Sequence, residues 1–501
     1  MAEIQMSEDA IKATQVLNRL AEELHRRREP VQRRLDYYRG KHKLCYASPE
    51  FRDYFANRFA GFADNWCAPV VAVPAERMNV LGIRLNEGSR AADKDLTQAW
   101  KAADCERGSS EAFVTMLASS RAYCLVWSDP EEDGVPRVTW ERPDQAIVGY
   151  DSDTGRRSAA LKLWADDTME YATLYQPKTV WKFQRSKSAT TGLTVSGLIV
   201  PSAGLVNASA WGGWEPRQGN DDVWPLPNPL GQVPMVEFRS QTLLDDDPVS
   251  DIDGVIAMQD AINLTWAYLM NALDYASLPQ RIVLGADIPK VPVLNSDGRV
   301  IGQRPVELDT LNSERIMWVP GEHARVAQWS PADLAAYSNV IERGVEHVAA
   351  QTRTPPHYLI GKLANLSAEA LTAAESGLVS KTGERIVYVD SSVREVYALM
   401  ALVQDNAEKA KACRSGTVVW ADIQFRALAQ KVDALVKMRQ IGFPLEWIAE
   451  QYGLEPTEVD RVMKMREKEA ESDPMMQALN PKPTPGEMVE DEAEEPVPAQ
   501  V

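Results

Sequence analysis

The segment of this sequence that comes nearest to a phosphate-binding loop is GLVSKT, at residues 377–382. A phosphate-binding loop follows the pattern G-x-x-x-x-G-K-[ST], because glycine amides must approach the phosphates while the lysine binds them. This segment lacks the glycine before the lysine, and it lies within a predicted helix and not after a strand. No GxGxxG motif opens a βαβ unit, so the sequence does not support nucleotide binding.

The densest group of carboxylates could serve a different chemistry. It consists of Asp245, Asp246, Asp247, Asp251 and Asp253. Clustered carboxylates hold the two cations, about 4 Å apart, of metal-dependent nucleases. The start of a helix prefers the same residues, because acidic side chains interact favourably with the positive end of the helix dipole. We favour the helix start and predict no metal site here.

The other residue types that could take part in catalysis are scattered. The histidines are His25, His42, His323, His347 and His357, and the cysteines are Cys45, Cys67, Cys105, Cys124 and Cys413. Their spacing matches no HExxH motif, facial triad or zinc pattern, so we expect the cysteines to be buried free thiols. A Ser/His/Asp or Cys/His triad stays possible from sequence alone, but no GxSxG motif is present. We therefore predict no catalytic residue and no cofactor.

Composition narrows the class further. The chain has 501 residues, 45% of them hydrophobic and 25% charged, which is typical of globular proteins and suggests about three domains. Its net charge of −18 opposes broad binding to DNA phosphates. No apolar run reaches the roughly 18–20 residues of a membrane helix, and the N-terminus lacks an apolar signal core. We expect a soluble protein, cytoplasmic when it is made.

The elements that would position any site begin with a helix at residues 8–40. It carries a basic cluster, namely Arg26, Arg27, Arg28, Arg33 and Arg34. A solvated helix face is one interpretation of this cluster, and a contact surface for an acidic partner subunit is the alternative. Residues 51–66 and 92–120 also look helical. Between them, residues 70–85 suggest short strands, because they combine β-branched residues with Pro74 and Gly82.

Six short strands are predicted between residues 122 and 184, because alternating apolar runs are separated there by turn residues. A long surface loop at 186–222 follows, which makes residues 1–240 an α+β region. A helix is then predicted from Asp245–Pro248 to Pro279, and short strands between 280 and 329. A second helix is predicted from Ser330, Pro331 and Asp333 to Thr352. The strands would therefore sit at the end of two antiparallel helices.

Prolines and a glycine interrupt residues 352–367, and a third long helix is predicted after Ser367. Gly377, Gly383 and residues 386–387 are candidate kinks in that helix. A strand at 417–425 is expected to return to the sheet of the first region. Short helices are expected near residues 427, 444 and 457. From residue 471 on, prolines and eight acidic residues against one lysine predict a disordered tail.

Several blocks of sequence carry a resemblance to a known family. They are RLDYYRGKHKLCYASPEF (34–51), NWCAPVVAVPAERMNVLGIR (65–84), NPLGQVPMVEFRS (228–240), DIDGVIAMQDAIN (251–263), YASLPQRIVLG (275–285), TRTPPHYLIG (352–361) and NLSAEALTAAESGLVSKTGER (365–385). In this order the blocks resemble the SPP1-type portal proteins of tailed phages, most of all those of actinobacteriophages. The resemblance implies a non-enzymatic protein that forms a dodecameric ring around a channel for double-stranded DNA.

The resemblance also implies a portal fold and its division. Residues 1–240 resemble the α/β wing, 241–278 and 330–352 the stem helices, 279–329 the β-rich clip, 353–366 the tunnel loop, 367–412 a long kinked wing helix, 413–426 a wing return strand, 427–470 the helical crown and 471–501 a disordered acidic tail. The residues expected to line the channel are Pro355, Pro356, His357, Tyr358 and Lys362. Asp251, Asp260 and Trp266 are expected in the stem, and Arg26, Arg27 and Arg28 at the subunit interface.

The implied setting is the portal vertex of a virion, with the host cytoplasm as the place of assembly. The implied partners are other copies of the chain, the terminase large subunit, a head–tail adaptor protein, the major capsid and scaffolding proteins, and DNA that passes through the channel, with no membrane. Two alternatives stay open. One is a packaging enzyme, either a nuclease or an ATPase, and the other is a different structural protein of the virion.

Overall fold

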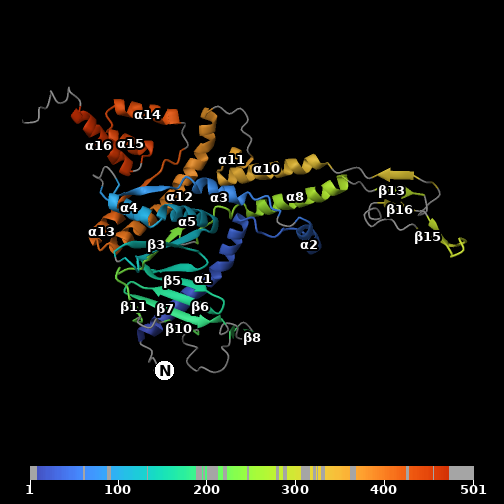
Figure 1. Ribbon diagram of the computed structural model, residues 1–501, viewed down its shortest axis with the longest axis horizontal. Coiled ribbons are helices and arrows are strands. Elements are labelled where there is room, and N and C mark those ends of the chain that lie inside the picture. Colours follow the sequence, from blue (N-terminus) through green and yellow to red (C-terminus); the bar gives the residue numbers. More distant parts are fainter. Residues whose placement is uncertain are drawn as a thin grey trace, which may run out of the picture.

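The structure is a computed structural model that describes most of residues 8–472. Outside the described residues lie 1–7, 60–61, 87–91, 133, 188–193, 196–197, 200–212, 218–222, 245–246, 278–280, 286–289, 306–315, 320–322, 324, 329–332, 361–367, 425–427, 455 and 473–501. The described chain is elongated: a body of helices and sheets carries a two-helix projection with strands at its far end (Figure 1). Lys362 therefore lies outside the described residues, and so does the predicted tail from Asp473 on.

The predicted N-terminal helix is confirmed as α1 (Glu8–Tyr38). Leu17, Leu20 and Leu24 lie on one face and are almost fully buried, as the helical spacing of apolar residues requires. This face packs against a sheet of four long antiparallel strands. They are β4 (Ala146–Tyr150), β5 (Arg157–Ala165), β6 (Met169–Tyr175) and β7 (Thr179–Ser186), and β10 (Glu215–Pro216) and β11 (Leu226–Pro227) pair with β7.

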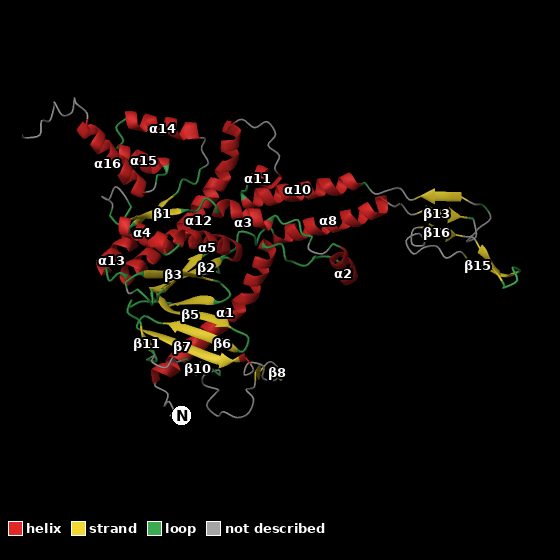
Figure 2. Cartoon of the chain, in the orientation of Figure 1, coloured by secondary structure: helices red, strands yellow, loops and turns green. Residues whose placement is uncertain are grey.

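All six predicted strands are present, but they belong to two sheets and not to one. The second sheet has the order β12-β2-β3, formed by β12 (Met235–Arg239), β2 (Arg121–Ser128) and β3 (Pro136–Glu141). Within the predicted loop at 186–222, β8 (Thr194–Val195) and β9 (Leu198–Ile199) pair with each other. Helices and strands mix throughout the body (Figure 2), so the α+β prediction is confirmed.

A layer of helices covers the second sheet. It contains α3 (Cys67–Ala75), α4 (Lys94–Ala102), α5 (Cys105–Ser119), α12 (Ala368–Val403) and α13 (Ala407–Ser415). The strand predicted within residues 70–73 is wrong, because this stretch lies in α3. Val70 and Val71 are fully buried where α3 packs against α1, α5 and α12, and burial on all sides outweighs the β-preference of valine. The strand at 80–84 is confirmed as β1 (Val80–Arg84).

The predicted return strand is shorter than expected. It is β18 (Thr417–Trp420), and it pairs antiparallel with β1 alone, in a sheet separate from the other two. The single helix predicted over 367–412 is two helices, because α12 ends at Val403 and Asp405 adopts a left-handed conformation before α13 begins. Hydrogen bonding of α12 is helical throughout the candidate kinks at Gly377 and Gly383.

Two long helices leave the body together. They are α8 (Ile256–Ser277) and α10 (Leu334–Thr352), which pack side by side in opposite directions (Figure 1). The helix start predicted at residue 248 is wrong, because residues 251–255 form turns held by contacts of Asp251 and Asp253 with the body. The second helix begins three residues after the predicted Pro331. There Asp333 is the N-cap and its carboxylate accepts from the amide of Ala335 at 3.0 Å.

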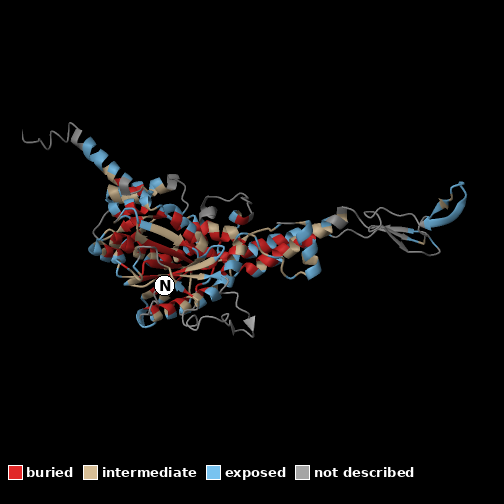
Figure 3. Cartoon of the chain, turned by 60° about the horizontal axis from the view of Figure 1, so that its bottom comes forward, coloured by how far each residue is buried: buried red, intermediate tan, exposed pale blue. Residues whose placement is uncertain are grey.

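The predicted β module lies at the far end of these helices. In it β13 (Arg281–Leu284) pairs in parallel with β16 (Ile316–Val319) and antiparallel with β17 (Arg325–Gln328), while β14 (Lys290–Leu294) and β15 (Val300–Pro305) form a hairpin. The hairpin is exposed along most of its length (Figure 3). The end of the projection therefore carries two separate small sheets.

The remaining helices are short. They are α2 (Pro49–Arg58), α11 (Pro356–Ile360), α14 (Leu428–Gln440), α15 (Leu445–Tyr452) and α16 (Pro456–Ser472). The last three confirm the helices expected near 427, 444 and 457. The segment 353–366, predicted to contain no helix, contains α11, because Pro356 occupies a first-turn position where its missing N–H costs nothing. No helix in the described ranges is long and apolar enough to cross a lipid bilayer.

Candidate channel and assembly site

The base of the projection is fixed by a buried carboxylate. The Asp251 side chain is fully buried and accepts a hydrogen bond from Arg385 Nε at 2.9 Å, and its Oδ2 lies 2.8 Å from Lys381 Nζ. Both cations come from α12. Burial lowers the pKa of Lys381, and the charge of Asp251 opposes that shift. One carboxylate and two cations thus join the start of the projection to the long helix.

A second clamp joins the same turn to α1. Both oxygens of Asp253 accept from Arg34, each at 2.8 Å, in the two-point geometry of a guanidinium–carboxylate pair. Arg34 also reaches the hydroxyl of Ser120 at 3.2 Å. One residue of the basic cluster of α1, Arg34, therefore binds its own chain and joins α1 to the base of the projection.

The three arginines predicted at a subunit interface differ in their surroundings. Arg27 pairs with Glu23 one turn away, and Arg28 Nε donates to the carbonyl of Asp144 at 3.0 Å. Arg26 is exposed. These positions leave Arg26 and Arg28 accessible at the surface of α1, and no contact with a second subunit is present to test the prediction.

Asp260 lies inside the junction between α8 and the N-terminal segment. Both of its oxygens accept from the hydroxyl of Tyr37, at 2.8 and 2.9 Å, and burial together with this carboxylate raises the pKa of Tyr37. The ring of Tyr37 stacks on His42 with 4.3 Å between centroids, and burial lowers the pKa of His42. His42 Nε2 is 2.7 Å from the amide nitrogen of Asn263. Asp260 therefore anchors α8 to the last turn of α1, and the stack of Tyr37 on His42 extends this junction to the residues that follow α1.

Trp266 makes the next contact along α8. Its indole N–H donates to Asp64 Oδ2 at 2.7 Å, and the indole of Trp66 donates to the same oxygen at 2.9 Å. Phe62 packs against Trp266 with 5.8 Å between ring centroids, and Phe51 of α2 packs against Tyr268 at 5.5 Å. All three predicted stem residues, Asp251, Asp260 and Trp266, therefore bind the chain's own body.

The proline-rich segment lies where α10 returns to the body. Arg353 ends α10 in a left-handed conformation, Pro355 is buried and Pro356 begins α11. The Tyr358 hydroxyl donates to Glu375 at 3.0 Å and accepts from Arg77 at 2.8 Å. Burial and the bond to Glu375 raise the pKa of this hydroxyl.

The other predicted channel residues are placed by the same cluster. His357 Nε2 lies 3.9 Å from Glu375, and Arg77 also donates to the carbonyl of Ile423 at 3.1 Å. Tyr358 keeps 38% of its surface exposed, so one side of the segment stays open to solvent. The structure thus places His357 and Tyr358 at Glu375, while Pro355 and Pro356 form the connection between α10 and α11.

Sequence reasoning did not find four residues that hold this region together. Arg77, Glu375, Lys381 and Arg385 carry the ion pairs, and of these only Lys381 was considered from the sequence, as the lysine of the GLVSKT segment and for a different chemistry. Their one common feature is a position within the sequence blocks at 65–84 and 365–385. These contacts join residues from 130 to 298 positions apart and leave no local pattern in the sequence, so only the fold reveals them.

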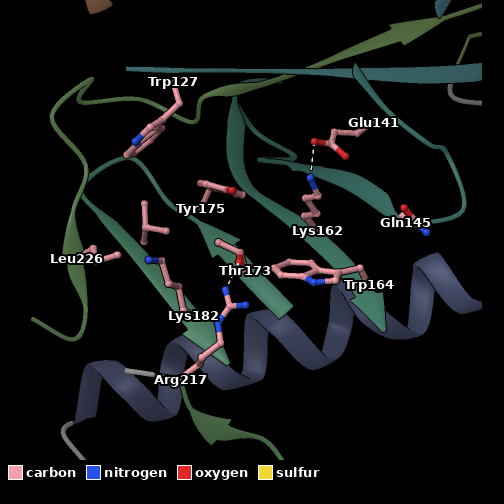
Figure 4. A pocket seen from close by; sticks show the side chains of 11 residues that line it. Trp127, Glu141, Gln145, Lys162, Trp164, Thr173, Tyr175, Lys182, Arg217 and Leu226 are labelled. Carbon is pink, nitrogen blue, oxygen red and sulfur yellow. Dashed lines mark hydrogen bonds and ion pairs between the residues drawn. The ribbon is translucent and has the colours of Figure 1, made fainter. Parts of the chain in front are cut away.

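A separate cleft of about 530 Å³ opens on the face of the β5–β7 sheet (Figure 4). Lys162 pairs with Glu141 at 2.5 Å on one side of it. Arg217 lies over the ring of Trp164, 4.9 Å from its centroid, and donates to the hydroxyl of Thr173 at 3.3 Å. The lining has cations and aromatic rings with a single carboxylate, which does not suit acid–base catalysis by paired carboxylates.

Within the described ranges, no group of three or more histidine, cysteine, aspartate or glutamate residues has the geometry to hold a metal ion. The charged residues of the junction are paired with each other and hold elements together. The described chain as a whole is an α+β body with a long two-helix projection that ends in small sheets. Residues 17–474 match the model of the phage portal proteins described as SPP1 Gp6-like, so the chain belongs to this family.

Individual relatives agree with the family. The portal proteins of Mycobacterium phages D29 and L5 are each 24% identical to this chain over 412 residues, which cover 79% of this chain and 77% of the relative. Among solved structures, the neck of an empty gene transfer agent particle with C6 symmetry matches at 15% identity and a TM-score of 0.40, over 82% of this chain and 94% of that chain. The neck of the native particle with C12 symmetry matches with a TM-score of 0.37 and 15% identity, over 82% of this chain and 95% of that chain. These TM-scores lie below 0.5, so the assignment depends on the family match alone.

Proposed function

We propose that this portal protein forms a ring at one vertex of the capsid, through which double-stranded DNA is packaged and later ejected. The observation that carries the proposal is the projection of α8 and α10 with its terminal sheets, in a chain that belongs to the portal family. The ring is proposed to be a dodecamer. A heterologous interface that repeats around a ring has to close on itself, and a rigid projection helps to fix the angle between copies.

The proposed division follows the elements. The α/β body up to residue 240, together with α12, α13 and β18, is the wing, while α8 and α10 are the stem. The strands β13–β17 are the clip, and α14–α16 are the crown. The segment 353–366 is proposed to narrow the channel, with His357, Tyr358 and Lys362 nearest to the DNA. A net charge of −18 for each subunit suits a channel wall that lets DNA slide without holding it.

The clip is proposed to dock the terminase large subunit during packaging and a head–tail adaptor afterwards. The wing is proposed to contact the major capsid and scaffolding proteins. The hairpin β14–β15 supports the first part of this proposal. Val300 and Ile301 are 61% and 67% exposed, and an isolated two-stranded hairpin is marginally stable in water. A neighbouring copy or a docked partner would cover these side chains.

Electron microscopy of the purified chain tests ring formation directly. We expect closed rings with a central hole in negative stain, and a chain that stays monomeric at high concentration would contradict the proposal. Deleting residues 285–320 should leave the body folded and abolish terminase or adaptor binding. Replacing Val300 and Ile301 by aspartate should give the same loss of binding. The matched control is Leu244→Asp, because Leu244 is 98% exposed on the body. Equal binding by the hairpin variant and the control would refute the docking role.

The channel proposal has its own test. Lys362→Glu should alter the packaging rate or the retention of DNA while rings form normally, because it reverses a charge proposed to touch phosphates. Lys362→Arg is the matched variant at the same position that keeps the charge, and it should handle DNA as the unchanged chain does. Failure of the Lys362→Glu protein to assemble, with normal DNA handling in the rings that survive, would make this segment an interface element.

A further inference from the structure

The cleft on the β5–β7 sheet lies beside the contact between the two sheets of the body. One face of the strands β4–β7 packs against α1. On the opposite face, Ala146, Val148 and Ala160 pack against side chains of β2 and β12. Further along this opposite face, the strands border a cleft of about 530 Å³. That volume lies within the range of pockets that bind ligands.

The alternation of side chains along the strands accounts for the lining. Residues two positions apart on a strand share a face, so each strand contributes two neighbours to the cleft. They are Lys162 and Trp164 of β5, Thr173 and Tyr175 of β6, and Val180 and Lys182 of β7. Trp127 of β2 lines the cleft from the second sheet, with 6.1 Å between its ring centroid and that of Tyr175 (Figure 4). Both sheets therefore contribute to the cleft.

Positive charge exceeds negative charge in this lining. Three cations, Lys162, Lys182 and Arg217, lie there with one carboxylate, that of Glu141, which gives a net charge of +2 in a chain of net charge −18. Burial and the charge of Glu141 raise the pKa of Tyr175, and the charge of Arg217 opposes that rise. The field of Arg217 thus acts inside the cleft, and it favours a ligand that carries negative charge.

The aromatic rings give the same cleft an apolar side. Trp127 and Trp164 are only partly buried, so part of each indole ring is left in contact with water. A ligand that covers such rings gains free energy from the removal of apolar surface from water. Tryptophan and arginine are also the residues that most often dominate the energy of protein interfaces. A ligand that suits this cleft therefore has carboxylates next to an aromatic group.

We propose that the cleft binds an acidic peptide segment of a partner protein. An aromatic side chain of the segment packs against Trp127, and carboxylates of the neighbouring peptide residues pair with Lys182 and Arg217. The cleft opens on the surface of the sheet, so both ends of a bound segment can continue into solvent. This site goes beyond the proposed function, because it belongs neither to the projection nor to the segment 353–366, and it does not require a ring.

Fluorescence anisotropy with a labelled pentapeptide tests the proposal. The probe has one phenylalanine between two pairs of glutamates, and it should bind the full chain, whereas the same peptide with lysines in place of the glutamates should not. K182Q/R217Q removes two charges of the lining and should weaken binding about tenfold. The matched control K12Q/R156Q removes the same charge from two exposed residues outside the cleft and should change the affinity less than twofold.

A second variant tests the aromatic part of the site. W127A should weaken binding of the phenylalanine peptide about tenfold, and should change binding of a peptide with alanine in its place less than twofold. Circular dichroism of each variant checks that the body is folded.

Three results would overturn the proposal. The first is equal binding of the peptide by K182Q/R217Q and K12Q/R156Q, and the second is an equal loss for both peptides in W127A. The third is displacement of the probe by inorganic phosphate as effectively as by unlabelled peptide at the same concentration, which would make the cleft a site for small anions.

Discussion

Replacing Asp251 by asparagine removes the charge that balances two buried cations. The side chains of Lys381 and Arg385 are 5% and 8% exposed, and their nitrogens lie 2.8 and 2.9 Å from the carboxylate. At an effective dielectric constant of 20, each contact has a gross Coulomb energy of about 6 kcal/mol. Desolvation offsets much of that energy, and removal of one partner from a buried pair costs about 3–5 kcal/mol. We expect Asp251→Asn to destabilise the body by that amount.

Urea unfolding followed by tryptophan fluorescence measures the effect. With an m-value of about 3 kcal/mol per M urea, the midpoint should fall by roughly 1–1.7 M. The matched control is Asp433→Asn, because Asp433 and Lys437 form an exposed pair at 2.7 Å, with side chains 65% and 71% exposed. Such a pair contributes about 0.5 kcal/mol or less, so its midpoint should change by less than about 0.2 M.

A double variant checks the physical cause. If the cost arises from cations left unpaired in the protein interior, Lys381→Met should restore part of the lost stability when Asp251 is already asparagine. Equal midpoints for Asp251→Asn and Asp433→Asn would refute the reasoning. So would a further loss of stability on adding Lys381→Met.

Four further predictions concern the same region. A methyl group on Gly344 would lie 2.9 Å from Ile262 Cγ1, so Gly344→Ala should lower the free energy of unfolding by about 1–3 kcal/mol in urea titrations. Gly377→Ala, whose nearest contact would be 3.6 Å, should raise it by up to about 1 kcal/mol. Tyr358→Phe should cost about 1–2 kcal/mol, seen as faster amide exchange over residues 356–360. Burial lowers the pKa of Lys381 below its ordinary value of 10.5, so at a pH between the lowered pKa and 10.5 the folded wild type binds fewer protons than its unfolded chain. The wild type therefore loses stability as pH falls from 10.5 to the lowered pKa. Lys381→Met lacks this group, so its free energy of unfolding should rise relative to that of the wild type over the same pH range.

Local patterns were enough to predict the elements that pack by one face. Leu17, Leu20 and Leu24 mark the buried side of α1, and the alternating strands between 122 and 184 are all present. The pattern failed at Val70 and Val71, since a helix buried on every side shows no polar face and resembles a strand. It failed again before α8, because Asp251 and Asp253 are fixed by cations from α12 and α1 and do not cap the helix.

The candidate site divides in the same way. The prolines were enough to predict that the helix ending at Thr352 does not continue, because proline acts through local backbone geometry, although α11 begins at Pro356 and residues 361–366 lie outside the described part of the chain. The partners of Tyr358 could not be predicted, since Arg77 lies 281 positions away along the chain. The partner of Trp266 lies 202 positions away. Prediction from a single sequence thus succeeds where neighbouring residues determine the local structure. It fails where a side chain binds a partner that is distant along the chain.

The projection also determines how the protein can change in size. The chain leaves the body at Ile256 and returns to it beside the same point at Thr352. Contacts of Asp251, Asp260 and Trp266 join the base of the projection to the body. Inserting seven residues into each of α8 and α10 would move the far strands outward by about 10 Å and keep the same faces in contact, since seven residues make nearly two helical turns. The distance between the body and the far sheets is therefore a quantity that evolution or an engineer can lengthen in steps, with the fold of either end unchanged.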